Sequence, residues 1–123
     1  MEIVASVIVG LVALVHVYFL VLEMFLWRTP RVRAIFGTTA EVAESSAVLA
    51  ANQGLYNGFL AAGLVFGLVA GGAKDTVGFP VTVFFLACVI VAGLYGAATA
   101  NRRILFVQAL PAAVGLVLVL LAR

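Results

Sequence analysis

Long apolar runs separated by short polar connections dominate the chain. Four runs reach the roughly 20 residues that a helix needs to cross the hydrocarbon core of a bilayer. They occupy residues 3–27, 48–70, 77–99 and 104–122. Unpaired backbone cannot face lipid, and the alternation of barrel strands is absent, so the runs predict helices. We therefore expect an all-α integral membrane bundle of four transmembrane helices, forming a single domain over residues 1–123.

The first run has a second interpretation, as a cleaved signal peptide. It is too long for the apolar region of such a peptide, no basic residue precedes it, and no cleavage site of small residues follows it. We therefore expect a true spanning helix.

The connection after the first run predicts a short amphipathic segment at the membrane interface. Thr29 before Pro30 is typical of an N-cap followed by the first helical position. Two arginines and several apolar residues then follow up to Gly37, and glycine commonly ends helices. Thr38 and Glu41 have the spacing of a capping box. The second helix should therefore begin well before residue 48.

Composition supports a membrane protein and argues against other classes. Of the 123 residues, 66% are hydrophobic and only 10% are charged, too few to cover a soluble surface. The net charge of +2 comes from few, scattered basic residues, so we expect no nucleic-acid partner. The lipid bilayer is the partner that this composition implies.

The distribution of basic residues predicts the orientation. Five arginines occupy the first and third connections, whereas the opposite side carries Lys74 and Arg123. The five are Arg28, Arg31, Arg33, Arg102 and Arg103. The positive-inside rule then predicts a multi-pass protein of the plasma membrane with both termini outside.

Cysteine and histidine limit the metal chemistry. One cysteine, Cys88, allows no intrachain disulfide, and with one histidine the chain offers no structural zinc site of its own. We expect no cofactor within one chain. A haem or metal shared between chains of an oligomer stays open.

Two ionisable residues lie inside the first run. His16 and Glu23 are seven residues apart, so they share a helix face. Ionisable groups in lipid are costly and normally face an interior or a wet cavity. Both are candidate functional residues. Alternatively, both have structural roles: His16 is a hydrogen-bonded core histidine, and Glu23 pairs with Arg102 or Asn52.

The second run opens with a polar block. Four residues fall within one arc of the helix: Asn52, Gln53, Tyr56 and Asn57. On the opposite arc, small residues predict close packing against another helix: Gly54, Gly58 and Ala61. Tyr95 in the third run and Gln108 in the fourth belong to the same cytoplasmic half. We therefore predict a polar pocket near the cytoplasm, although such residues also bond helices together or form interfacial belts.

These residues resemble a known family. The segments that carry the resemblance are His16, Glu23 to Trp27, the Asn-Gln-Gly-Leu-Tyr-Asn-Gly block at residues 52–58, and Gln108 to Ala112. Together they are similar to the four-helix membrane family called domain of unknown function 1304, over essentially the whole chain. The resemblance implies no activity, but its motifs coincide with the predicted pocket.

Three functions compete. In the first, the pocket binds a small apolar or amphiphilic molecule, and Glu23 isomerises or hydrolyses it by acid–base chemistry. His16 would then relay the proton and Tyr95 would stabilise an oxyanion. The residues that would orient the ligand are Asn52, Gln53, Tyr56, Asn57 and Gln108.

The second function is a proton-linked transporter. Four helices are few for alternating access, so this function requires a homo-oligomer, for which the glycine seams offer contacts. The third is a structural or accessory membrane subunit in which Glu23 and His16 only lock the bundle.

Overall fold

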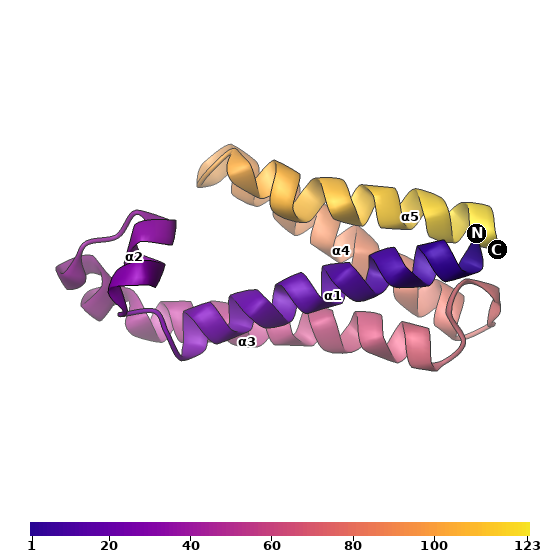
Figure 1. The fold of residues 1–123 in the computed structure, drawn as a ribbon, viewed down its shortest axis with the longest axis horizontal. Coiled ribbons are helices and arrows are strands. Elements are labelled where there is room, and N and C mark those ends of the chain that lie inside the picture. Colours follow the sequence, from indigo (N-terminus) through magenta and orange to yellow (C-terminus); the bar gives the residue numbers. More distant parts are fainter. The chain divides into compact units, whose positions relative to one another are not determined.

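The computed structural model of the protein describes all 123 residues and contains helices and connections without strands. The helices follow in chain order (Figure 1): α1 Glu2–Met24, α2 Pro30–Phe36, α3 Ala40–Val69, η1 Gly72–Lys74, α4 Gly78–Thr99, η2 Leu105–Ala109 and α5 Leu110–Ala122. The short η1 is a 3-10 turn and η2 is a π-helical turn. The predicted all-α class is confirmed.

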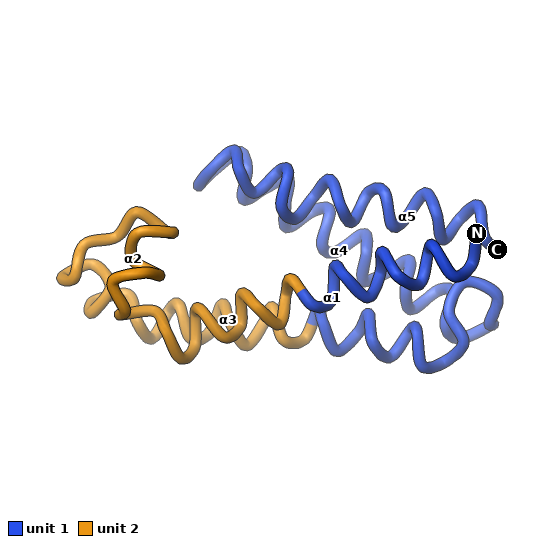
Figure 2. The backbone as a smooth tube through the Cα atoms, viewed as in Figure 1, with its two compact units in different colours: residues 1–14, 60–123 blue, residues 15–59 orange.

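The chain divides into two compact units. Unit 1 consists of residues 1–14 and 60–123, and unit 2 of residues 15–59 (Figure 2). The divisions fall inside α1 and α3, so each of these helices contributes to both units.

Unit 1 has an apolar core to which four helices contribute. Its most deeply buried large side chains are Val9 of α1, Leu64 of α3, Leu86 and Val89 of α4, and Val119 of α5. These side chains interlock as in any close-packed interior, and small residues let the helices approach.

In unit 1, α4 approaches η2 closely. A Cβ atom added to Gly93 would lie 2.7 Å from the backbone nitrogen of Ala109. The π-helical turn ends at Ala109, two residues before Pro111. Proline has no N–H to donate to the carbonyl four residues back, and its ring crowds that carbonyl. A wider turn at this place is the usual structural consequence.

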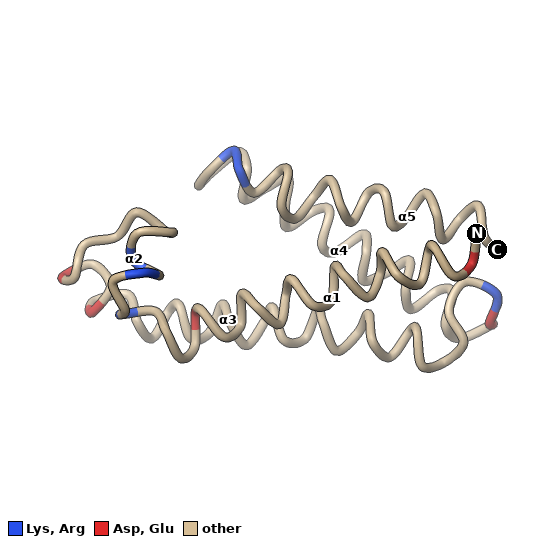
Figure 3. Tube along the Cα trace, viewed as in Figure 1, with Lys and Arg blue, Asp and Glu red and all other residues tan.

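Three helical segments are long and apolar enough to cross a membrane: Glu2–Met24, Gly78–Thr99 and Leu105–Ala122. α4, η2 and α5 carry no charged residue, and charges gather at helix ends and connections (Figure 3). Large apolar side chains of α4 such as Phe84, Val91 and Leu94 are exposed. Such a surface is a liability in water and suits lipid, so the chain is compatible with a multi-pass membrane protein.

The expected fourth span lies in α3, which is not among these three segments. α3 is 30 residues long and begins at Ala40, well before residue 48 as the sequence predicted. Its polar block at residues 52–58 lowers its hydropathy relative to the other three helices.

The short helix α2 has the boundaries that the sequence predicted. Thr29 is its N-cap, and its hydroxyl oxygen accepts a hydrogen bond from the backbone N–H of Val32 at 3.4 Å. Pro30 occupies the first helical position, and Gly37 ends the helix with a φ of +70°. Glycine adopts this left-handed conformation without steric cost, which explains why the helix stops there.

The predicted capping residue of α3 is wrong by one position. The N–H of Val42 donates to the hydroxyl of Thr39 at 3.1 Å, so Thr39 caps the helix. Thr38 instead donates its backbone N–H to the carbonyl of Arg33 at 3.0 Å. Because the hydrogen bond from Thr38 belongs to the C-terminal end of α2, Thr39 is the first residue available to cap α3.

α1 ends at Met24, three residues before the predicted end of the first run. The hydroxyl of Thr29 donates to the carbonyl of Leu26 at 2.7 Å, and the backbone N–H of Thr29 donates to the same oxygen at 3.1 Å. These bonds fold residues 26–29 into a turn, so Trp27 lies outside the helix.

Candidate functional site

A hydrogen bond between α1 and α3 joins two of the predicted site residues in unit 2. The side-chain amide of Asn57 donates to Oε1 of Glu23 at 2.6 Å. Both side chains are half-buried, and the second carboxyl oxygen of Glu23 has no hydrogen-bond partner. A bond from an amide to a carboxylate is stronger than one between neutral groups. The pair therefore couples the two helices and fixes the orientation of the carboxyl group.

Two glycines of α3 allow this approach. A Cβ atom added to Gly54 would lie 3.2 Å from Cβ of Glu23 and 2.6 Å from Cγ of Met24. One added to Gly58 would lie 2.7 Å from Cδ1 of Leu20. The sequence predicted that Gly54 and Gly58 pack against another helix, and α1 is that helix in unit 2.

His16 lies deeper along the same face of α1. Its side chain is fully buried, and its ring meets that of Phe19 edge-on with 5.7 Å between the centroids. Seven residues separate it from Glu23, which is about 10 Å along a helix. His16 and Glu23 therefore share a face without being immediate neighbours.

The prediction that Asn57 lies opposite Gly54 and Gly58 is wrong, because Asn57 and both glycines face α1. Asn52, Gln53 and Tyr56 are exposed, whereas Asn57 turns toward α1. Asn57 lies three residues after Gly54, which places the two on one helix face. The ligand-binding role of the exposed members stays a prediction.

Tyr95 and Gln108 belong to unit 1. The side chain of Tyr95 is 72% exposed on α4, and its backbone carbonyl accepts a hydrogen bond from the hydroxyl of Thr99 at 2.7 Å. Gln108 is half-buried within η2. Their predicted roles, stabilising an oxyanion and orienting a ligand, stay predictions.

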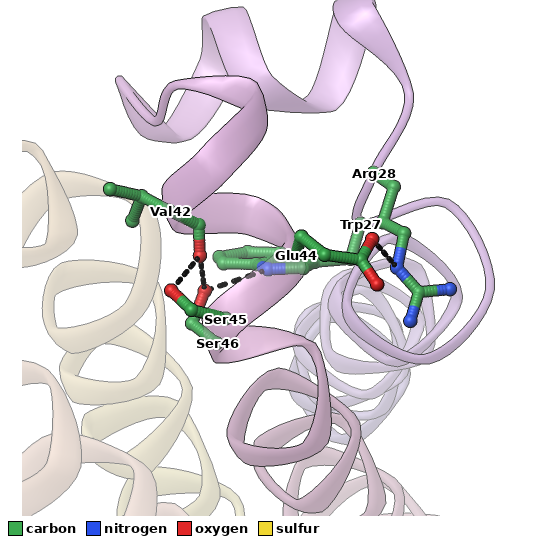
Figure 4. A network of polar contacts seen from close by, with 6 residues as sticks. All are labelled: Trp27, Arg28, Val42, Glu44, Ser45 and Ser46. Atoms are coloured by element: carbon green, nitrogen blue, oxygen red, sulfur yellow. Dashed lines mark hydrogen bonds and ion pairs between the residues drawn. The ribbon is translucent and has the colours of Figure 1, made fainter.

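The sequence reasoning missed a second set of polar contacts in unit 2 (Figure 4). The indole N–H of Trp27 donates to the hydroxyl of Ser46 at 3.1 Å. Nε of Arg28 lies 2.9 Å from a carboxyl oxygen of Glu44. This ion pair is largely exposed, so it contributes little to stability. The signal available in the sequence was the Glu-Ser-Ser run at residues 44–46, in the part of α3 that precedes the predicted span.

Hollows on the surface of unit 1 do not coincide with the candidate residues. One is lined by apolar side chains of α4, η2 and α5, among them Ile90 and Phe106. Another lies along α5 near Val114 and Val117. Neither has the polar groups that usually orient a ligand.

At the contact between α1 and α3, the group available for acid–base chemistry is the carboxyl group of Glu23. Glu23 has one oxygen held by Asn57 and one without a partner, so it can exchange a proton there. The structure contains no group of three or more residues that could hold a metal ion.

Comparisons with known proteins agree with the resemblance seen in the sequence. An uncharacterized protein of Lactococcus lactis subsp. lactis (strain IL1403), YpaA, is 31% identical over 110 residues, which cover 88% of this chain and 89% of that protein. No solved structure matches. The model of the family described as "Protein of unknown function (DUF1304)" matches residues 10–120. Since this match covers most of the chain, the protein belongs to the DUF1304 family.

Proposed function

We propose that the protein crosses the plasma membrane four times, with the apolar part of α3 as the remaining span. At 1.5 Å per residue, the 30 residues of α3 extend about 45 Å, which exceeds the roughly 30 Å hydrocarbon core. Within unit 2 the polar block finds a partner on α1 through Asn57, which lowers the cost of placing it in lipid. In this topology α2 lies in the headgroup layer and both termini are outside.

We further propose that Glu23 is the centre of an intramembrane site for a small, partly apolar molecule. The observation that carries this proposal is the half-buried carboxyl group with one oxygen fixed by Asn57 and the other without a partner. The second oxygen can accept a hydrogen bond from a ligand or hold a transferable proton. An ionisable side chain within a membrane helix is costly, which favours a functional role for it.

In this site each residue has a distinct task. The free oxygen of Glu23 takes a proton from the ligand or gives one to it, as an isomerisation or hydrolysis by acid–base chemistry requires. Asn57 holds the carboxyl group in one orientation. The exposed polar side chains of α3, Asn52, Gln53 and Tyr56, bind the polar end of the ligand. His16, two turns away, exchanges protons with Glu23 through the ligand or water.

The decisive experiment is native mass spectrometry of the protein purified in lipid nanodiscs. We expect the wild type to retain a molecule of defined mass and Glu23→Gln to lose it. Glu44→Gln is the matched control, since it removes the same charge from an exposed ion pair of the same unit. The control should retain the molecule, and the measured mass also gives the number of subunits.

Two results would contradict the site. Bare protein in all three samples, together with lower thermal stability for Glu23→Gln alone, would assign the pair to helix packing. Equal loss of the molecule in both variants would show that binding depends on net charge and not on the Glu23 carboxyl group.

A further inference from the structure

Two hydrogen-bond donors without acceptors lie at the end of α2. Nε of Arg33 and the hydroxyl oxygen of Thr38 are both buried, and neither has a hydrogen-bond partner. The two residues are joined through the backbone, because the N–H of Thr38 donates to the carbonyl of Arg33 at 3.0 Å. Burying a donor without an acceptor is destabilising, and native structures rarely leave two together. The pair therefore points to an acceptor that binds there.

Charge identifies the kind of acceptor. The structure contains one ion pair, Arg28 with Glu44, so no carboxylate neutralises Arg31 or Arg33. A guanidinium group and a hydroxyl group both donate well to the oxygens of a phosphate group, which accept several hydrogen bonds at once. A bound anion would satisfy both orphan donors and compensate the positive charge of α2.

The surroundings of this pair suit a lipid. Ile35 and Phe36 of α2 are 50% and 41% exposed. Trp27 packs on Phe36 with 4.9 Å between the ring centroids. Tryptophan is enriched where headgroups meet acyl chains. The short helix therefore presents apolar side chains for acyl chains close to its cationic donors.

We propose that Arg33 and Thr38 form a binding site for the phosphate group of an anionic membrane phospholipid. Nε of Arg33 and the hydroxyl of Thr38 donate to the phosphate oxygens, and the exposed apolar side chains of α2 contact the acyl chains. This site rests on the proposed topology, in which α2 lies in the headgroup layer, and it is separate from the proposed ligand site at Glu23.

The test is native mass spectrometry of the full-length protein in neutral detergent, titrated with phosphatidylglycerol. We expect Arg33→Gln to weaken binding about tenfold or more, since it removes a charged donor. Thr38→Val keeps the shape of the side chain and should weaken binding about fivefold. Arg31→Gln is the charge-matched control on the same helix, and its loss should not exceed about threefold.

Further variants and probes keep the proposal falsifiable. Arg33→Lys keeps the charge but has no Nε donor, so it should still bind less tightly than the wild type. The proposal is overturned if Arg33→Lys and Thr38→Val both bind within about twofold of the wild type. It is also overturned if Arg31→Gln loses as much affinity as Arg33→Gln. Inorganic phosphate binding as tightly as the lipid would show that the ligand is a free anion and not a phospholipid.

Discussion

Disrupting the bond between Glu23 and Asn57 should cost measurable stability, and the structure sets the scale. Neutral hydrogen bonds between membrane helices contribute about 0.6 kcal/mol on average and at most about 1.7. Hydrogen bonds to charged groups contribute about 1.5–3 kcal/mol. The 2.6 Å distance is at the short end of the range, but both side chains are only half-buried. We therefore expect a coupling of about 1–2 kcal/mol.

A double-mutant cycle isolates this coupling from other effects of the substitutions. Glu23→Ala keeps the Cβ atom that packs near Gly54, so the glycine seam stays filled. Glu23→Ala and Asn57→Ala should each lower the free energy of unfolding, and the double variant should lose less than the sum. Equilibrium unfolding in mixed detergent micelles measures all four proteins.

The control cycle pairs Glu23 with the exposed Asn52. Their coupling should be close to zero, because the structure contains no hydrogen bond between them. Glu23→Gln should retain a neutral bond and reduce the coupling to Asn57 to about 0.6 kcal/mol. A Glu23–Asn57 coupling no larger than that of the control would refute the reasoning, since the observed bond would then contribute nothing to the packing of α1 against α3.

Two further predictions concern unit 1. Gly93→Ala should lower the free energy of unfolding by about 1–3 kcal/mol, because its Cβ would lie 2.7 Å from the backbone of Ala109. Gly115→Ala is the control, because its Cβ would lie 3.4 Å from the nearest atom, and it should be neutral or stabilising. Chemical denaturation measures both variants, and an equal loss of unfolding free energy in the two would contradict this packing. Hydrogen bonds from the backbone N–H groups of Gly78 and Val77 lower the pKa of Asp75 from its ordinary value of 3.8. These bonds therefore stabilise the folded protein above that pH, and the stabilisation is lost as the pH falls below it. Asp75→Ala should therefore make the free energy of unfolding less dependent on pH in the acid range. An unchanged pH dependence would show that the hydrogen bonds from Val77 and Gly78 to Asp75 do not stabilise the start of α4.

Local sequence chemistry determined where several helices begin and end. Thr29, Pro30 and Gly37 predicted the boundaries of α2, because capping and backbone conformation depend on a few neighbouring residues. Local chemistry was insufficient where two helices share a connection. Thr38 and Thr39 offer the same hydroxyl group, and only the hydrogen bond from Thr38 to Arg33 decided that Thr39 caps α3.

The candidate site shows the same division. Periodicity predicted that Gly54 and Gly58 form a packing face, and it identified Glu23 and the polar block as candidates. It could not choose a partner for Glu23, because a helical wheel gives a direction around one helix axis and not the distance to another helix. The approach of α1 and α3 made Asn57 that partner and left Asn52, Gln53 and Tyr56 exposed. The sequence thus determined which chemical groups are available, and the tertiary structure decided which of them meet, since contact depends on how closely two helices pack.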